Sequence, residues 1–226
     1  MWLILAHAND LPARTLAHRW AGRAVLRTPA ELCRDRWTLE LDPEGTVRTS
    51  TTGEPAAVVS RLGVVTAADL PGVHPDDRSY AAAELTAFLM AWLDACPAPV
   101  LNRPTAGSLN GPPWHAEQWA AAAESVGLRP APIRRRVGGP SRPEPLWHSM
   151  IYANVVGDWC LRDVHPAVGE RLCALGRLAG TPLLGAAVSG PGRDARVRDI
   201  CAWPDLGVPA VADALAKTLD LVGVRA

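Results

Sequence analysis

Short apolar runs alternate with a helical pattern at the start of the chain. Residues 2–6 form an apolar run that predicts a buried strand, residues 11–20 carry apolar side chains at helical spacing, and residues 24–26 form a second short run. This strand–helix–strand order is typical of an open α/β sheet, in which ligands bind at the carboxyl ends of the strands. Asn9 and Asp10 follow the first predicted strand, so they are secondary candidates for ligand contacts.

The next segment predicts a hairpin, a strand and a long helix. Residues 37–41 and 46–50 alternate in polarity around the turn sequence Asp-Pro-Glu-Gly, and residues 56–65 form a further apolar run. A helix is predicted over residues 80–95, with Asp76 or Ser79 as its cap. Its apolar face repeats at helical spacing and consists of Leu85, Phe88, Leu89, Trp92 and Leu93.

The stretch from residue 99 to residue 130 predicts the join between two halves of the chain. A short strand at residues 99–101 leads into the polar turn Asn102-Arg103-Pro104, and a helix is predicted over residues 114–126. Between them stand a glycine and two prolines, which we interpret as a hinge. The predicted domains are therefore residues 1–112 and residues 113–226.

The second half predicts a mixture of strands and helices after a basic loop. Arg134, Arg135 and Arg136 begin a Pro/Gly-rich stretch that has neither a helical nor a strand period. Beyond it the pattern predicts a strand, a helix, two strands and a helix, over residues 150–156, 166–179, 182–189, 196–202 and 208–222. The predicted fold class is α/β, with an open α/β domain followed by an α+β half.

The composition indicates a folded protein with no strong electrostatic partner. Of the 226 residues 48% are apolar, and the formal net charge is zero, so we expect neither nucleic acid nor an anionic membrane as a partner. The five cysteines include no C-x-x-C pair, which favours a reducing compartment. The apolar start lacks the basic residues of a signal peptide, and no long apolar window occurs. We therefore expect a cytoplasmic protein.

The order of these segments resembles the ATP-grasp enzymes, and in particular their carboxylate–amine ligase and peptide-maturase branch. The resemblance rests on the sequence VLNRP, the glycine–proline hinge and the helix that ends in GLRP. The later segments YANVVGDWC, LLGAAVSG and RVRDICAWPDL resemble the C-terminal part of the same family. The resemblance implies a pre-ATP-grasp-like N-terminal domain and an ATP-grasp-like C-terminal half.

Compared with that family, the chain lacks most of the lid subdomain. The family has several strands and helices after the GLRP turn, whereas only residues 131–150 stand there in this chain. The family clamps phosphates with lysines, but Lys217, the single lysine, falls on the predicted closing helix. Arg134, Arg135 and Arg136 are the candidate replacements, because guanidinium groups bind phosphate bidentately. The alternative for these arginines is a solvated basic loop.

The resemblance also implies that the magnesium site is reduced. The final strand of the family carries Glu-x-Asn, and here Asp199 and Cys201 stand at those two positions. The preceding strand has alanines where a further acid is expected. Magnesium prefers hard oxygen ligands, so a thiol is a poor substitute. Asp199 is the candidate metal ligand, and the alternative is a strand residue paired with Arg196 or Arg198.

Asn102 and Arg103 are the main candidates for a retained ligand site. Arg103 would bind a carboxylate or a phosphate at the end of a strand. The alternative is that Asn102 closes the turn and that Arg103 pairs with Glu84. Cys160 and His165 offer at most half of a zinc site, and we expect His165 to cap the helix that follows it.

Three functions follow from these observations. The first is a non-catalytic or partner-dependent accessory protein in a peptide or small-molecule modification pathway, with no catalytic residue and no cofactor; a protein partner or a second copy would cover the surface that the lid leaves exposed. The second is an active ATP-dependent carboxylate–amine ligase that uses ATP and Mg²⁺ and obtains its lid from a partner. The third is a small-ligand binding module that uses the cleft near Arg103.

Overall fold

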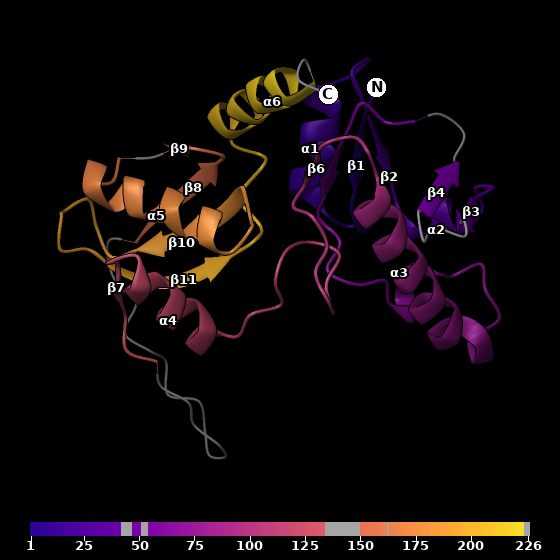
Figure 1. The fold of residues 1–226 in the computed structure, drawn as a ribbon, viewed down its shortest axis with the longest axis horizontal. Coiled ribbons are helices and arrows are strands. Elements are labelled where there is room, and N and C mark those ends of the chain that lie inside the picture. Colours follow the sequence, from indigo (N-terminus) through magenta and orange to yellow (C-terminus); the bar gives the residue numbers. More distant parts are fainter. Residues whose placement is uncertain (42–46, 51–53, 134–149, 162, 224–226) are drawn as a thin grey trace. The chain divides into compact units, whose positions relative to one another are not determined.

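The chain forms two compact units in a computed structural model that describes residues 1–41, 47–50, 54–133, 150–161 and 163–223 (Figure 1). The first unit comprises Met1–Pro113 together with Asp205–Ala226, and the second comprises Trp114–Pro204. The C-terminal residues, which the sequence places in the second half, therefore group with the first unit. The physical reason is a helix with one buried apolar face, described below.

A parallel sheet forms the centre of the first unit. Its strands are β1 (Trp2–Leu5), β2 (Ala24–Arg27), β5 (Ala57–Ser60) and β6 (Val100–Leu101), in the order β2-β1-β5-β6. This arrangement confirms the predicted open α/β sheet. The strand predicted over residues 56–65 ends at Ser60, because its neighbour β1 ends at Leu5, the residue that pairs with Ser60.

Helices pack on both faces of this sheet. Helix α1 (Leu11–Arg19) lies on the face of Trp2, whose ring centroid is 4.9 Å from that of Trp20. Helix α3 (Arg78–Ala95) packs its buried side chains on the opposite face. That core contains Leu89, Trp92 and Leu93 from α3, together with Leu5, Val58 and Val100 from the strands.

The shorter elements of this unit explain two differences from the sequence prediction. Helix α3 begins at Arg78, directly after a 3₁₀ turn at Pro75–Asp77, and Asp77 is its N-cap residue. Of the two predicted caps, Asp76 lies in the 3₁₀ turn and Ser79 lies inside the helix. Another 3₁₀ turn, Ala67–Asp69, and the four-residue helix α2 (Pro29–Leu32) are too short for a periodic pattern to predict. Strands β3 (Thr38–Leu41) and β4 (Val47–Ser50) form the predicted antiparallel hairpin, whose turn lies outside the described residues.

The closing helix α6 (Pro209–Gly223) has a buried apolar face and an exposed charged face. Val211, Leu215 and Leu219 are almost completely buried. On the exposed face Asp213 and Asp220 form ion pairs with Arg19 and Arg23 of the first unit, at 2.8 and 2.7 Å. These contacts join the two ends of the chain in one unit.

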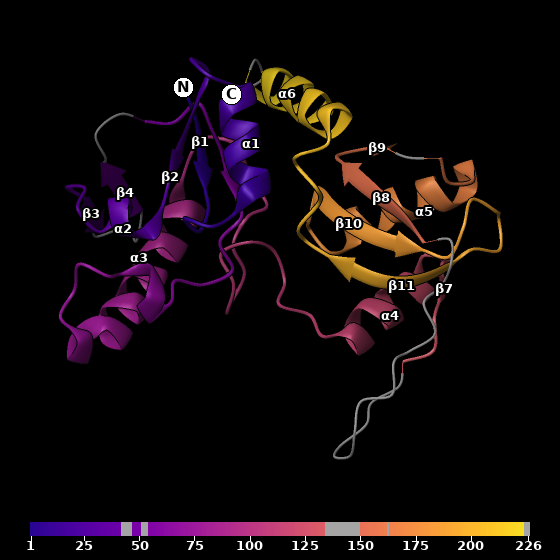
Figure 2. The same cartoon turned by 180° about the vertical axis from the view of Figure 1, so that it is seen from behind.

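The second unit is a five-stranded sheet with both helices on one face (Figure 2). The strands are β7 (Arg129–Pro130), β8 (Ile151–Val156), β9 (Trp159–Leu161), β10 (Leu183–Val188) and β11 (Arg196–Cys201), in the order β7-β11-β10-β8-β9. Helices α4 (Ala116–Ser125) and α5 (Pro166–Leu178) pack on alternate side chains of the sheet, including Val155, Leu184 and Ile200. The opposite face carries no helix among the described residues of this unit. We call it the open face.

The described helices include none that is long and apolar enough to cross a membrane.

Candidate functional site

The open face of the second unit holds the candidate metal ligand. Asp199 of β11 is exposed on this face and pairs across the sheet with Ala187 of β10, which in turn pairs with Tyr152 of β8. Cross-strand partners place their side chains next to each other on one face. The register therefore puts an alanine opposite Asp199. Within the described residues, no group of three or more histidine, cysteine or acidic side chains could hold a metal ion.

The second row of the open face is partly covered by the chain itself. Gly185 of β10 pairs with Cys201 of β11 on one side and with Asn154 of β8 on the other. A Cβ atom at Gly185 would lie 3.2 Å from the carbonyl oxygen of Trp203 and 3.4 Å from the Cα of Pro204. The segment after β11 thus crosses this row at close range, and a larger side chain at Gly185 would push against its backbone.

The predicted alternative, in which Asp199 pairs with Arg196 or Arg198, is not seen for Arg196. Nη1 of Arg196 reaches the carbonyl oxygen of Pro130 at 3.5 Å. Among the described residues Asp199 forms no ion pair with Arg196. The metal role of Asp199 stays a prediction, and its carboxylate is accessible.

The predicted phosphate clamp cannot be placed. Arg134, Arg135 and Arg136 lie outside the described residues, so their role stays a prediction. Strands β7 and β8 are separated by residues 131–150 alone, which is consistent with the truncated form that the sequence predicts.

Arg103 is engaged with the end of a helix. Its Nη1 donates hydrogen bonds to the carbonyl oxygens of Leu93 and Asp94, both at 3.2 Å, and its Nη2 donates to that of Cys96 at 3.4 Å. These carbonyls belong to the C-terminal turn of α3, which has no intrahelical partners for its last carbonyl groups. The guanidinium group therefore caps α3 in place of the predicted pairing with Glu84.

Asn102, the residue that precedes Arg103, is completely buried. This burial suits the structural alternative, in which the amide belongs to the turn that follows β6. A ligand role for Asn102 and Arg103 stays a prediction, and such a ligand would compete with the helix end for the guanidinium group.

A buried ion pair connects the loops that follow β1 and β5. Nε of Arg61 lies 2.7 Å from Oδ2 of Asp10, and the two side chains are 9% and 8% exposed. The other carboxylate oxygen of Asp10 accepts a hydrogen bond from the backbone N–H of Ala13, which caps α1. Asp10, a secondary candidate for ligand contacts, thus has both oxygens engaged within the protein, whereas Asn9 is exposed.

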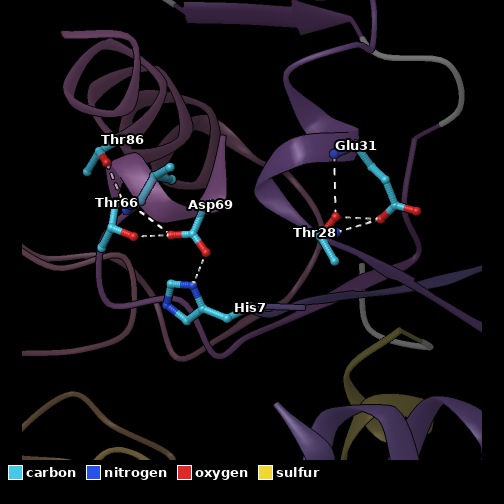
Figure 3. A network of polar contacts seen from close by, with 7 residues as sticks. His7, Thr28, Glu31, Thr66, Asp69 and Thr86 are labelled. Atoms are coloured by element: carbon cyan, nitrogen blue, oxygen red, sulfur yellow. Dashed lines mark hydrogen bonds and ion pairs between the residues drawn. The ribbon is translucent and has the colours of Figure 1, made fainter. Parts of the chain in front are cut away.

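A histidine–carboxylate pair lies at the same edge of the sheet (Figure 3). Nδ1 of His7 is 2.7 Å from Oδ1 of Asp69. Oδ2 of Asp69 accepts hydrogen bonds from the backbone N–H and the hydroxyl of Thr66, at 2.8 and 2.7 Å. Burial would raise the pKa of Asp69, but the hydrogen bonds from Thr66 and His7 outweigh it and hold this pKa below its usual value.

The sequence does not reveal these pairings, because their members are far apart in the chain. His7 and Asp69 are separated by 62 positions, and Asp10 and Arg61 by 51. The available signals were weaker: His7 follows the first strand, and Arg61 is a lone arginine within an apolar run. Neither signal identifies a partner.

A shallow groove of about 490 Å³ is lined by α3 and by residues 64–67. Its walls are mostly apolar, and Thr86 on α3 engages its hydroxyl with the carbonyl of Ala82 and the N–H of Val65. The groove therefore offers apolar contact with few free hydrogen-bonding groups.

Cys160 and His165 do not form a metal site or a nucleophile–base pair. Nδ1 of His165 accepts a hydrogen bond from the N–H of Ala167 at 3.2 Å and caps α5, as predicted. Burial, and to a smaller extent the neighbouring Cys173, raises the pKa of the Cys160 thiol to about 11. A thiol that stays protonated is neither a good nucleophile nor a good metal ligand.

Solved structures of one enzyme class match this chain over nearly its whole length. The ligase PsnB, solved with a phosphomimetic variant of a minimal precursor, Mg and ADP, has a TM-score of 0.64 and 15% identity, over 98% of this chain and 97% of that chain. The chain has an ATP-grasp-like fold. The macrocyclase MdnC of Microcystis aeruginosa MRC, bound with the precursor peptide MdnA, matches this ATP-grasp-like chain with a TM-score of 0.66 and 10% identity, over 97% and 99% of the two chains.

A third ATP-grasp structure gives the same result at still lower identity. The RiPP-associated ligase of Chryseobacterium gregarium, in complex with ADP and a leader and core peptide, has a TM-score of 0.63 and 9% identity, over 100% of this chain and 97% of that chain. The sequence itself matches no family model and no curated protein. The fold of this ATP-grasp-like protein is thus evident from its structure, in agreement with the resemblance of its motifs.

The described residues of the ATP-grasp-like open face offer a reduced donor set for a magnesium–nucleotide complex. Such a complex is held by one or two carboxylates in near-octahedral oxygen geometry. Here Asp199 faces Ala187, and the next row has Gly185 opposite Cys201, whose Sγ donates to the carbonyl oxygen of Trp203. The two rows offer the carboxylate of Asp199 and the amide of Asn154, whereas the thiol of Cys201 is a poor ligand for Mg²⁺.

Proposed function

We propose that this chain is a non-catalytic ATP-grasp-like accessory protein of a peptide-modification pathway, which binds a peptide and does not itself form the amide or ester bond. The observation that carries the proposal is the register of β10 and β11, which places Ala187 opposite Asp199 and Gly185 opposite Cys201. The fold is retained, while among the residues of β10 and β11 Asp199 is the one carboxylate available to Mg²⁺.

The peptide part of the proposal is supported by the solved ATP-grasp structures. PsnB and MdnC are complexed with precursor peptides, and the ligase of Chryseobacterium gregarium is complexed with a leader and core peptide. A chain that keeps this fold and loses the donor set would keep the capacity to hold a peptide more readily than the capacity to activate it. A partner chain, or a second copy, would then cover the surface that a lid covers in a complete enzyme.

Calorimetric titration with Mg-ATP tests the catalytic part. We expect no saturable heat for the unaltered protein, and the same result for Asp199→Ala and for the control Asp194→Ala, an exposed acid of the same unit paired with Arg129. Saturable binding that Asp199→Ala abolishes and Asp194→Ala preserves would overturn the proposal.

The alternative is an active ATP-dependent ligase that is completed by a partner, with Arg134, Arg135 and Arg136 on the phosphates. It predicts that Mg-ATP binds once the partner is added and that changing the three arginines to glutamine removes this binding. The accessory function predicts instead that a precursor peptide encoded beside the gene binds without nucleotide, as measured by fluorescence anisotropy. A protein that binds neither Mg-ATP nor the peptide has neither function.

A further inference from the structure

His7 lies where the strand order of the parallel sheet in the first unit reverses, between β1 and β5. In the order β2-β1-β5-β6, the connection after β1 leads to a strand on one side, and the connection after β5 leads to a strand on the other. The crevice between two such loops, at the carboxyl ends of the strands, is the usual ligand site of open α/β sheets. His7 follows β1, and the loop after β5 carries Thr66 and Asp69.

The hydrogen bonds of Asp69 fix the tautomer of His7. Its lowered pKa keeps Asp69 ionised at neutral pH, so both of its oxygens are acceptors. Nδ1 of His7 must therefore be the donor in the 2.7 Å contact with Oδ1. In the neutral ring Nε2 is then an acceptor with a lone pair, and Figure 3 shows this second nitrogen pointing away from Asp69. The side chain of His7 is 26% exposed, so a ligand can reach it.

The charge of this pair is not balanced by the groups that contact it. Asp69 contacts the neutral N–H and hydroxyl of Thr66 and the ring of His7. Arg61, which follows β5 in the same loop as Asp69, forms a buried ion pair with Asp10. With a neutral His7, the His7–Asp69 pair carries one negative charge behind an accepting nitrogen. An ammonium group complements this pair, because it carries a positive charge and N–H donors on the same group.

We propose that His7 and Asp69 form a binding site for a primary ammonium group, which donates a hydrogen bond to Nε2 of His7. Asp69 acts through His7, by holding the ring in the accepting tautomer and by supplying the compensating charge. The ammonium group can come from the N-terminus of a peptide or from a lysine-type side chain. This site lies within the first unit and does not depend on the function proposed for the open face.

Long-range proton–nitrogen NMR spectra of the ¹⁵N-labelled full chain test the site. We expect the amine-bound ring of His7, assigned with the variant His7→Gln, to show the Nδ1–H tautomer. Glycinamide, which represents a peptide N-terminus, and n-butylamine, which represents a lysine side chain, should shift its Nε2 resonance saturably. The tighter of the two identifies the source of the ammonium group. Tetramethylammonium, which has the charge without an N–H donor, should leave the resonance unchanged.

Two variants separate the site from a general effect on the fold. Asp69→Asn should weaken the binding of the preferred amine about tenfold or more, because a charge-assisted contact is lost. The control His74→Gln should bind normally, because His74 forms an exposed pair with Asp76 in the same unit. Circular dichroism confirms that each variant is folded. If Asp69→Asn is not, His7→Gln serves as the second test variant, with amine binding measured by calorimetry.

Three outcomes would overturn the proposal. The first is an amine-bound His7 ring that is protonated, or an Nε2–H tautomer. The second is the lack of a saturable shift with both amines. The third is an equal shift with tetramethylammonium, because a site that ignores the N–H donor is not built around Nε2.

Discussion

Single residues decide whether a candidate site is a site, and Arg103 is the clearest case. Its guanidinium group donates to three carbonyl oxygens at the C-terminus of α3. A cation at this end of a helix also interacts favourably with the helix dipole. We expect Arg103→Ala to lower the free energy of unfolding by about 1–2 kcal/mol. Urea denaturation followed by tryptophan fluorescence measures the change.

The control for Arg103 is an exposed arginine on another helix. Arg14 on α1 is exposed, so Arg14→Ala should change the stability by less than about 0.5 kcal/mol. If Arg103 is a ligand contact rather than a helix cap, Arg103→Ala keeps its stability. In that case amino acids or dipeptides raise the melting temperature of the unaltered protein but not that of Arg103→Ala.

At the scale of elements, the periodic segments could be predicted from the sequence, whereas several of the short ones could not. The long helix α3, the helices α1 and α5 and the strands β8 and β10 occur close to their predicted positions. Strands β7 and β9 have two and three residues, which is too short for an alternation to be recognised. Their position depends on the neighbours β11 and β8 and not on their own pattern.

The candidate sites divide in the same way. The opposition of Asp199 and Ala187 could be predicted, because both residues fall in strands that the resemblance aligns. The pairs His7–Asp69 and Asp10–Arg61 could not, because only the folding of the sheet brings the ends of β1 and β5 together. For Arg103 the sequence gives the residue but not its partners, which are backbone carbonyls and therefore have no sequence pattern.

Helix α5 contains a glycine that its packing requires. A Cβ atom at Gly176 would lie 2.9 Å from the backbone carbonyl oxygen of Thr181, at the turn that leads into β10. Alanine favours a helix by about 1 kcal/mol over glycine, but here the backbone would have to move. We expect Gly176→Ala to destabilise the protein by about 1–3 kcal/mol in thermal unfolding. Gly192→Ala, where the new methyl meets no atom within 4 Å, is the control. A Gly176→Ala variant that melts higher than the unaltered protein contradicts this packing.

On the scale of the whole molecule, the chain closes its first unit with its last helix. The apolar face of α6 buries Val211, Leu215 and Leu219, while its ion pairs to Arg19 and Arg23 are exposed. Buried leucines contribute far more to stability than exposed ion pairs do. The grouping of residues 205–226 with residues 1–113 should therefore depend on the apolar face of this helix.

Leu215→Ala tests this dependence in the full chain. We expect a loss of about 2–5 kcal/mol, because a completely buried leucine leaves a cavity. Hydrogen exchange should become faster in peptides from residues 1–113 and stay unchanged in those from residues 114–204, because only the first unit includes α6. Asp213→Asn, which removes one exposed ion pair, should cost less than about 1 kcal/mol and alter neither unit. Faster exchange in residues 114–204 of Leu215→Ala would show instead that the two units unfold together, since the cavity lies in a helix that belongs to the other unit.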